Sequence, residues 1–282
     1  MSDSSLLYEF WKKFRKQKMA MLAGCLLTLL FVVALLGPAI TPYPMDAPDY
    51  NHLLALPSLS HWAGTDEFGR DIFSRILAGT RISLAVGISS VLFSAILGTI
   101  LGLISGFYGK WVDTVIMRIA DVLLAFPGIL LAIGIIAILG PGLKNVVIAV
   151  ATFGVPIFAR IVRGSTLALK NSVYVEAASS MGAKNRRMIW KHIFPGTFPT
   201  IIVYFTMRIG TAIITASSLS FLGLGAQPPT PEWGAMLSSG RNYLNTAPHV
   251  ALFPGLAIFF TVMAFNLFGD GLRDALDPKI NS

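Results

Sequence analysis

The chain has 282 residues, of which 54% are hydrophobic and only 13% are charged. A soluble domain of this length would carry about a quarter charged residues. Several apolar runs of about 20 residues indicate a polytopic membrane protein instead. The net charge of +8 lies in short segments between these runs, with no basic stripe interleaved with aromatic residues, so it argues against a nucleic-acid-binding protein.

The chain opens with a basic segment, residues 1–18, that is predicted to be cytoplasmic. Its five cations precede an apolar run from Met19 to Ile40 and are Lys12, Lys13, Arg15, Lys16 and Lys18. That run is longer than the apolar core of a signal peptide and leads into GPAITPYP rather than a cleavage site. It therefore predicts an uncleaved first membrane helix. The single cysteine, Cys25, lies inside this run and excludes an intramolecular disulfide.

Six membrane spans are predicted in an all-α fold. Their approximate ranges are 19–40, 82–106, 117–139, 145–163, 199–221 and 250–269. If the N-terminus is cytoplasmic, 16 of the 22 Lys and Arg residues fall in cytoplasmic segments, as the positive-inside rule requires. Both termini are therefore expected in the cytoplasm. The expected organisation is a basic segment 1–18, a first helix and external segment 19–81, and a core 82–282.

The external segment is expected to end in an amphipathic helix. From Asp71 to Leu84 the apolar residues recur at helical spacing, which predicts a helix lying at the outer interface. The following span then carries a small residue at every fourth position: Ser90, Ser94, Gly98, Gly102 and Gly106. Such a row lets two helix backbones approach closely in lipid, but it does not identify the partner helix.

Two predicted spans contain an internal proline, Pro127 in the third and Pro156 in the fourth. Each is expected to kink its helix, with neighbouring groups satisfying the freed carbonyls. A gating hinge at either position is the alternative to a purely structural kink.

A polar stretch, residues 160–195, interrupts the apolar sequence with seven Lys or Arg residues and one acid, Glu176. Asn171 or Ser172 can cap a short helix from Val173 to Met181. Gly182 then offers a turn that residues with a Cβ adopt poorly. A second short helix is expected from Lys184 to Ile193, ended by Pro195. Such a loop is expected on the cytoplasmic side, where a soluble partner can bind it.

The fifth span carries an arginine at mid-membrane depth, Arg208. A buried intramembrane arginine costs at least ~2.5 kcal/mol on insertion scales, so it usually faces a cavity or a partner. Tyr204, Arg208, Thr211 and Thr215 recur at steps of three and four residues and share one helix face. This polar stripe predicts the lining of a translocation path, with snorkelling of the arginine to the inner interface as the alternative.

No active site is predicted in this chain. The sequence has no Walker-type glycine loop, H-E-x-x-H pair or nucleophile elbow, and its four histidines are scattered. We therefore expect no catalytic residue, no metal and no cofactor. A secondary transporter would show repeats and broken helices around midplane ion sites, and an intramembrane enzyme would need paired catalytic groups within the spans; neither pattern is present.

The polar loop resembles the EAA loop of importer-type ABC permeases. The resemblance lies in Glu176-Ala177-Ala178, then three residues, Gly182, twelve residues and Pro195. Four further segments are similar to the dipeptide/oligopeptide/nickel subfamily, to its C-type subunits and most closely to dipeptide or glutathione import permeases: GTDEFGRDIFSR, IMRIADVLLAFPGILLAI, SFLGLGAQPPTPEWGAML and AFNLFGDGLRDALDPK.

This resemblance implies a type I ABC importer permease fold in a bacterial inner membrane. It implies a heterodimer with a homologous B-type permease, two cytoplasmic ATPase subunits and an extracytoplasmic substrate-binding protein. The coupling loop would span 164–198, ATP would be hydrolysed by the partner subunits, and this chain would form half of the channel. Dipeptides or oligopeptides are the expected substrates, with glutathione or nickel chelates as the alternative.

Overall fold

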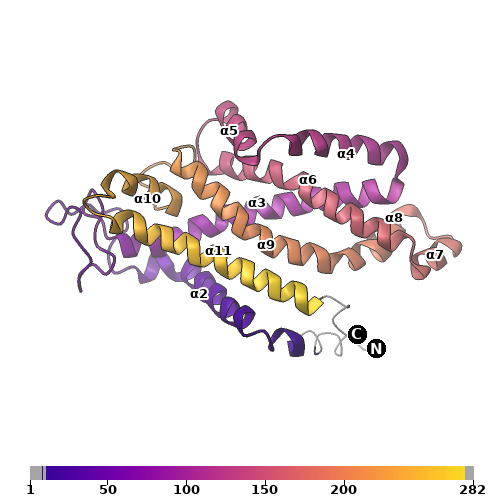
Figure 1. The fold of residues 1–282 in the computed structure, drawn as a ribbon, viewed down its shortest axis with the longest axis horizontal. Coiled ribbons are helices and arrows are strands. Elements are labelled where there is room, and N and C mark those ends of the chain that lie inside the picture. Colours follow the sequence, from indigo (N-terminus) through magenta and orange to yellow (C-terminus); the bar gives the residue numbers. More distant parts are fainter. Residues whose placement is uncertain (1–7, 9–10, 277–282) are drawn as a thin grey trace.

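The computed structural model describes Tyr8 and residues 11–276, and the regular secondary structure in this part of the chain consists of helices and one bridge between Thr65 and Asp71. Five helical runs are long and apolar enough to cross a membrane. They are α2 (Lys18–Ile40), α3 (Ile72–Tyr108), α6 (Leu143–Lys170), the run Asn185–Phe221 that ends in α9 (Phe194–Phe221), and α11 (His249–Leu276). These five form one elongated bundle (Figure 1).

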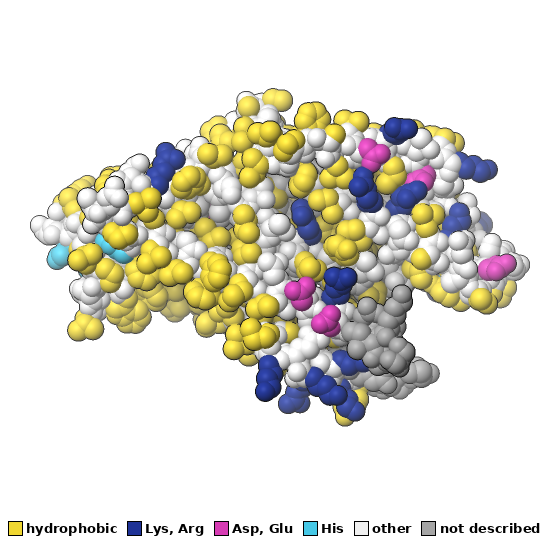
Figure 2. Space-filling model, viewed as in Figure 1, with side chains coloured by type: hydrophobic (Ala, Val, Ile, Leu, Met, Phe, Trp, Pro, Cys, Tyr) yellow, Lys and Arg dark blue, Asp and Glu magenta, His cyan; other side chains and the backbone are white. Residues whose placement is uncertain are grey.

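The elements predicted to share a side of the membrane lie at one end of the bundle. The start of α2, the end of α11 and α7 (Val173–Ser180) occupy one end, whereas segment 41–71 and α10 (Trp233–Gly240) occupy the other (Figure 1). Most Lys and Arg side chains visible in Figure 2 lie toward the end that carries α7. The middle of the face shown in Figure 2 is largely hydrophobic. The basic side chains on the face shown are therefore concentrated at the end that carries α7.

The third predicted span, 117–139, is a broken helix rather than a kinked one. Helix α4 (Lys110–Ala125) and helix α5 (Gly128–Leu139) meet at an angle of 93°. Phe126 between them is extended, with ψ of 137°, because the ring of the following proline disfavours helical backbone at the preceding residue. The bundle therefore has five spans, or six if this bent pair is one. Pro156, by contrast, lies within a continuous α6.

The prediction of a separate amphipathic helix at 71–84 was wrong, because α3 runs unbroken from Ile72 to Tyr108. Asp71 caps it by accepting a hydrogen bond from the Ser74 amide at 2.7 Å. The first turns are then buried by external residues: the indole Nε1 of Trp233 donates to the Ile76 carbonyl at 3.2 Å. Packing against α10, rather than an interface with lipid, explains the apolar positions of this segment.

The row of small residues on α3 packs against α6. A Cβ added to Gly98 would lie 2.7 Å from the Val155 carbonyl oxygen, and one added to Gly102 would lie 2.6 Å from that of Ala159. At Gly106 the contact is Thr166, whose Cβ would be 2.7 Å away. The two backbones therefore approach too closely for any side chain larger than hydrogen at these three positions.

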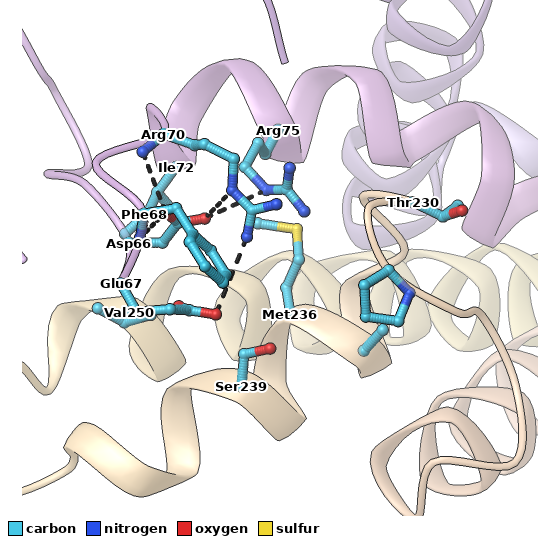
Figure 3. Close-up of a pocket in the computed structure, with 12 residues that line it drawn as sticks. Asp66, Glu67, Phe68, Arg70, Ile72, Arg75, Thr230, Met236, Ser239 and Val250 are labelled. Carbon is cyan, nitrogen blue, oxygen red and sulfur yellow. Dashed lines mark hydrogen bonds and ion pairs between the residues drawn. The ribbon is translucent and has the colours of Figure 1, made fainter. Parts of the chain in front are cut away.

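At the opposite end of the bundle, Arg75 joins three segments that are distant in sequence. Its Nη1 donates to the Met45 carbonyl at 2.8 Å, its Nη2 donates to the Pro229 carbonyl at 3.1 Å, and its Nε lies 3.6 Å from Asp66. Asp66 also pairs with Arg70 at 2.7 Å (Figure 3). This buried ion-pair cluster fixes segment 41–71 and the loop after α9 onto the start of α3.

Candidate coupling loop and translocation face

Helix α7 begins and ends where the sequence predicts. Ser172 is its N-cap residue, with extended backbone, although its hydroxyl donates to the Leu169 carbonyl instead of capping the helix. Gly182 has φ of +82° and donates to the Ser179 carbonyl at 2.9 Å, while the Ala183 amide donates to Ala178 at 3.1 Å. This pair of bonds is a Schellman motif, which needs a left-handed residue at the glycine position.

The second short helix does not stop at Pro195 as predicted. One turn of α8 (Asn185–Arg187) continues into a π-helical turn, η1 (Met188–Ile193), and then directly into α9. Pro195 is the second residue of α9 and directly follows the π-helical turn, so the helical backbone continues through the proline. The helical run from Asn185 to Phe221 therefore connects the loop to the fifth span without a break.

A hydrophobic cluster attaches the loop to three membrane helices. From the loop it contains Val175, Ala178, Met188, Ile189 and Ile193, and from the spans it contains Leu103 of α3, Val162 of α6 and Ile201 of α9. Ile193, Leu103 and Val162 are completely buried. The loop and the ends of these three helices therefore share one close-packed cluster.

The outer face of the loop exposes large apolar side chains. Val173 is 83% exposed and Met181 is 82% exposed, and Tyr174 and Trp190 are each about half exposed. Arg186, Arg187 and Lys191 are exposed around them. Large exposed apolar side chains together with exposed charges are typical of a protein interaction site. These four apolar residues are not among the site residues predicted from the sequence. They could have been found there as large apolar side chains in a segment predicted to face water.

The structure divides the five predicted coupling residues by position. Glu176 and Ala177 are exposed on α7, whereas Ala178 is buried and belongs to the cluster beneath it. Gly182 and Pro195 are exposed at the turn and at the start of α9. The two alanines thus have different surroundings, one toward solvent and one toward the membrane helices.

The polar residues of the fifth span share a face that the rest of the chain covers only in part. Tyr204 and Thr211 are exposed, and Arg208 and Thr215 are partly exposed. The Thr215 hydroxyl donates back to the Thr211 carbonyl of its own helix at 2.9 Å. The buried face of α9, which includes Ile209, Ile213 and Ala216, packs into the main core. The stripe is therefore available to water or to another subunit.

Two of the four histidines each contact an aspartate. His61 contacts Asp71 at 3.0 Å and His52 contacts Asp49 at 2.8 Å. Within Tyr8 and residues 11–276, no three His, Cys, Asp or Glu side chains converge as metal ligands.

Two family descriptions match the chain. Residues 98–282 match the family described as "Binding-protein-dependent transport system inner membrane component". Residues 5–57 match "N-terminal TM domain of oligopeptide transport permease C".

Similar proteins cover nearly the whole chain. A protein of Pectobacterium atrosepticum named "Glutathione transport system permease protein GsiD" is 58% identical over 275 residues, which are 97% of this chain and 91% of that protein. A protein of the same name from Escherichia coli O6:K15:H31 is 60% identical over 274 residues, 97% of this chain and 90% of that protein.

Solved structures share the fold at low identity. A chain of the MetNI methionine ABC transporter, described as inward facing, aligns with a TM-score of 0.59 and 19% identity over 73% of this chain and 98% of its own. A chain of an amino acid ABC transporter aligns with a TM-score of 0.55 and 14% identity, over 70% and 92%. The helical core is thus that of an ABC importer permease.

Proposed function

This chain belongs to the family of binding-protein-dependent inner-membrane transport components, and we propose that it is a translocation subunit of an ATP-driven glutathione importer. The proposal of glutathione as the substrate rests on the sequence identity of 58% and 60% to two glutathione permeases over 97% of the chain. From the sequence, dipeptides and oligopeptides are the expected substrates and glutathione is an alternative. The relatives favour the alternative.

The proposed partners follow from the surfaces that the chain leaves open. The exposed face of α7 with Val173, Tyr174, Glu176 and Met181 is where a cytoplasmic ATPase would dock. One ATPase would serve this chain and a second would serve a homologous B-type permease. An extracytoplasmic binding protein would deliver the substrate at the opposite end, near segment 41–71 and α10.

The proposed coupling step is mechanical. Closure of the two ATPases would displace α7, and the cluster around Ile193 and Val162 would carry that displacement to α3, α6 and α9. The chain itself would hydrolyse nothing, because ATP would bind only to the partner subunits.

The polar face of α9 is the proposed lining of the path. Glutathione carries carboxylate groups, and the Arg208 guanidinium can form charge-assisted hydrogen bonds with one of them during passage. Tyr204, Thr211 and Thr215 would offer hydroxyl groups along the same line. The B-type permease would supply the opposite wall.

Reconstitution tests this proposal directly. The chain is co-purified with its B-type permease and ATPases in proteoliposomes, and uptake of radiolabelled glutathione is measured with binding protein and ATP. We expect uptake that requires ATP, is inhibited by vanadate, and is reduced by excess unlabelled glutathione more than by a dipeptide. Stronger inhibition by the dipeptide would support the peptide alternative, and uptake without ATP would contradict the ABC importer function.

A further inference from the structure

An apolar groove runs along the outside of the bundle between α2, α9 and α11. Its volume is about 720 Å³, which lies within the range of sites that bind small molecules, ~300–1,000 Å³. Its walls are almost entirely apolar and include Gly24, Cys25 and Thr28 of α2, Ile209 of α9, and Phe265 and Phe268 of α11.

Two aromatic residues of the N-terminal segment close one end of the groove. Phe14 is only 4% exposed and meets the Phe268 ring edge-on, with centroids 5.4 Å apart. Trp11, which is 48% exposed, stacks against Phe14 at 6.3 Å. Tryptophan is enriched at the level of lipid headgroups. This end of the groove therefore lies at the membrane surface.

The same end carries a concentration of positive charge. No carboxylate of the described residues lies within ion-pair distance of its five cations, Lys12, Lys13, Arg15, Lys16 and Lys18. The last turns of α11 add one exposed cation, Arg273, and two exposed carboxylates, Asp270 and Asp274. Among the described residues of these two segments, cations therefore outnumber carboxylates by six to two. Membrane topology alone would explain the basic residues, but not an apolar groove beginning among them.

The groove has the depth of one lipid leaflet. From Lys18 to Phe31, the deepest lining residue of α2, the helix rises by about 20 Å. Half of a hydrocarbon core is about 15 Å, and the headgroup region adds the remainder. An acyl chain lying along α2 would therefore place its headgroup beside the lysines.

We propose that this groove is a binding site for an anionic phospholipid, with one acyl chain between α2, α9 and α11 and the phosphate among the cations of residues 12–18. The excess of cations favours this occupant over a helix of the partner permease, whose apolar surface would gain nothing from them. The proposal does not depend on which substrate the transporter imports.

Native mass spectrometry of the full-length chain in mild detergent tests the site. The chain is titrated with phosphatidylglycerol or with phosphatidylcholine of identical acyl chains, and the fraction of lipid-bound protein is measured. We expect the half-saturating concentration of phosphatidylglycerol to be lower by about tenfold or more, since each cation near a membrane surface contributes about fivefold.

Matched variants localise the lipid. Lys12→Gln with Lys16→Gln should lower the phosphatidylglycerol affinity by about 25-fold, whereas Arg186→Gln with Arg187→Gln, on the exposed loop, should not change it. Thr28→Trp and Cys25→Phe each fill the groove and should abolish the bound lipid. Leu29→Trp should leave it bound, because Leu29 is 58% exposed and does not line the groove. Size-exclusion profiles confirm that each variant is folded.

Three outcomes overturn the proposal. Equal affinity for both lipids would show that the groove has no anionic preference, and binding that survives both groove-filling variants would place the lipid elsewhere. Exclusion of phosphatidylglycerol whenever the B-type permease is present would make the groove a protein interface. None of these measurements reads transport, so their failure is distinguishable from failure of the proposed function.

Discussion

Arg163 of α6 binds Asp113 of α4 through the Nε–Nη2 edge of its guanidinium, with Nε–Oδ1 and Nη2–Oδ2 distances of 2.5 and 2.6 Å. The Ser105 hydroxyl of α3 donates to the same carboxylate. Three helices therefore meet at Asp113, at the end of the bundle that carries the coupling loop. This bidentate pair holds the first half of the broken span against the bundle.

Replacing Arg163 with alanine is expected to destabilise the chain by about 1 kcal/mol, because the two side chains are only 32% and 20% exposed. The melting temperature in detergent should fall by about 2–4 °C. Arg160→Ala is the matched control, since its single contact with Asp121 joins side chains that are 55% and 56% exposed. That variant should melt like the wild type; a larger loss for Arg160 would contradict the assignment.

Replacing Gly182 with valine should abolish uptake while leaving membrane insertion intact. Its φ of +82° is a conformation that β-branched residues adopt only with strain, and a displaced turn would misplace α7. Nothing lies within 4 Å of the added Cβ, so the effect is conformational and not steric. Gly182→Asn, which tolerates this φ, should retain most of the uptake. Normal uptake by the valine variant would exclude a coupling role for the turn.

Gly102→Ala should destabilise the contact between α3 and α6 by about 1–3 kcal/mol, since its Cβ would lie 2.6 Å from a backbone oxygen. Gly134→Ala, in α5, has open space around the same atom and should have no such effect. Thermal unfolding of the two purified variants compares the positions. Equal stability would show that the close approach of the helices is not needed.

Arg208→Ala should reduce the initial rate of glutathione uptake by about tenfold. This factor corresponds to the free energy of one lost charge-assisted hydrogen bond. The test compares glutathione with an analogue, amidated at one carboxyl group, that the wild type still imports. If the arginine binds that carboxylate, only glutathione uptake should fall. An equal reduction for both substrates would argue that Arg208 has a structural role, and Arg208→Lys should recover part of the rate.

Features of the loop that depend on neighbouring residues could be predicted from the sequence. Gly182 in a left-handed turn and Ser172 at the start of α7 both followed from short-range rules. The same rules do not distinguish a proline that ends or breaks a helix from one that lies within a continuous helical run. Pro195 lies in a helix that continues, whereas Pro127 lies at a bend of 93°. Which outcome occurs depends on the helices packed around each proline.

The class of protein, the apolar spans and the outline of the loop could therefore be predicted from the sequence. They depend on bilayer thickness, charge distribution and backbone sterics, which act locally along the chain. Only the tertiary structure decided that the small residues of α3 face α6, that Ala178 is buried while Ala177 is exposed, and that Arg75 joins Met45 to Pro229. Each of these relationships joins residues far apart in the sequence, and long-range packing selects among partners that local patterns leave equivalent.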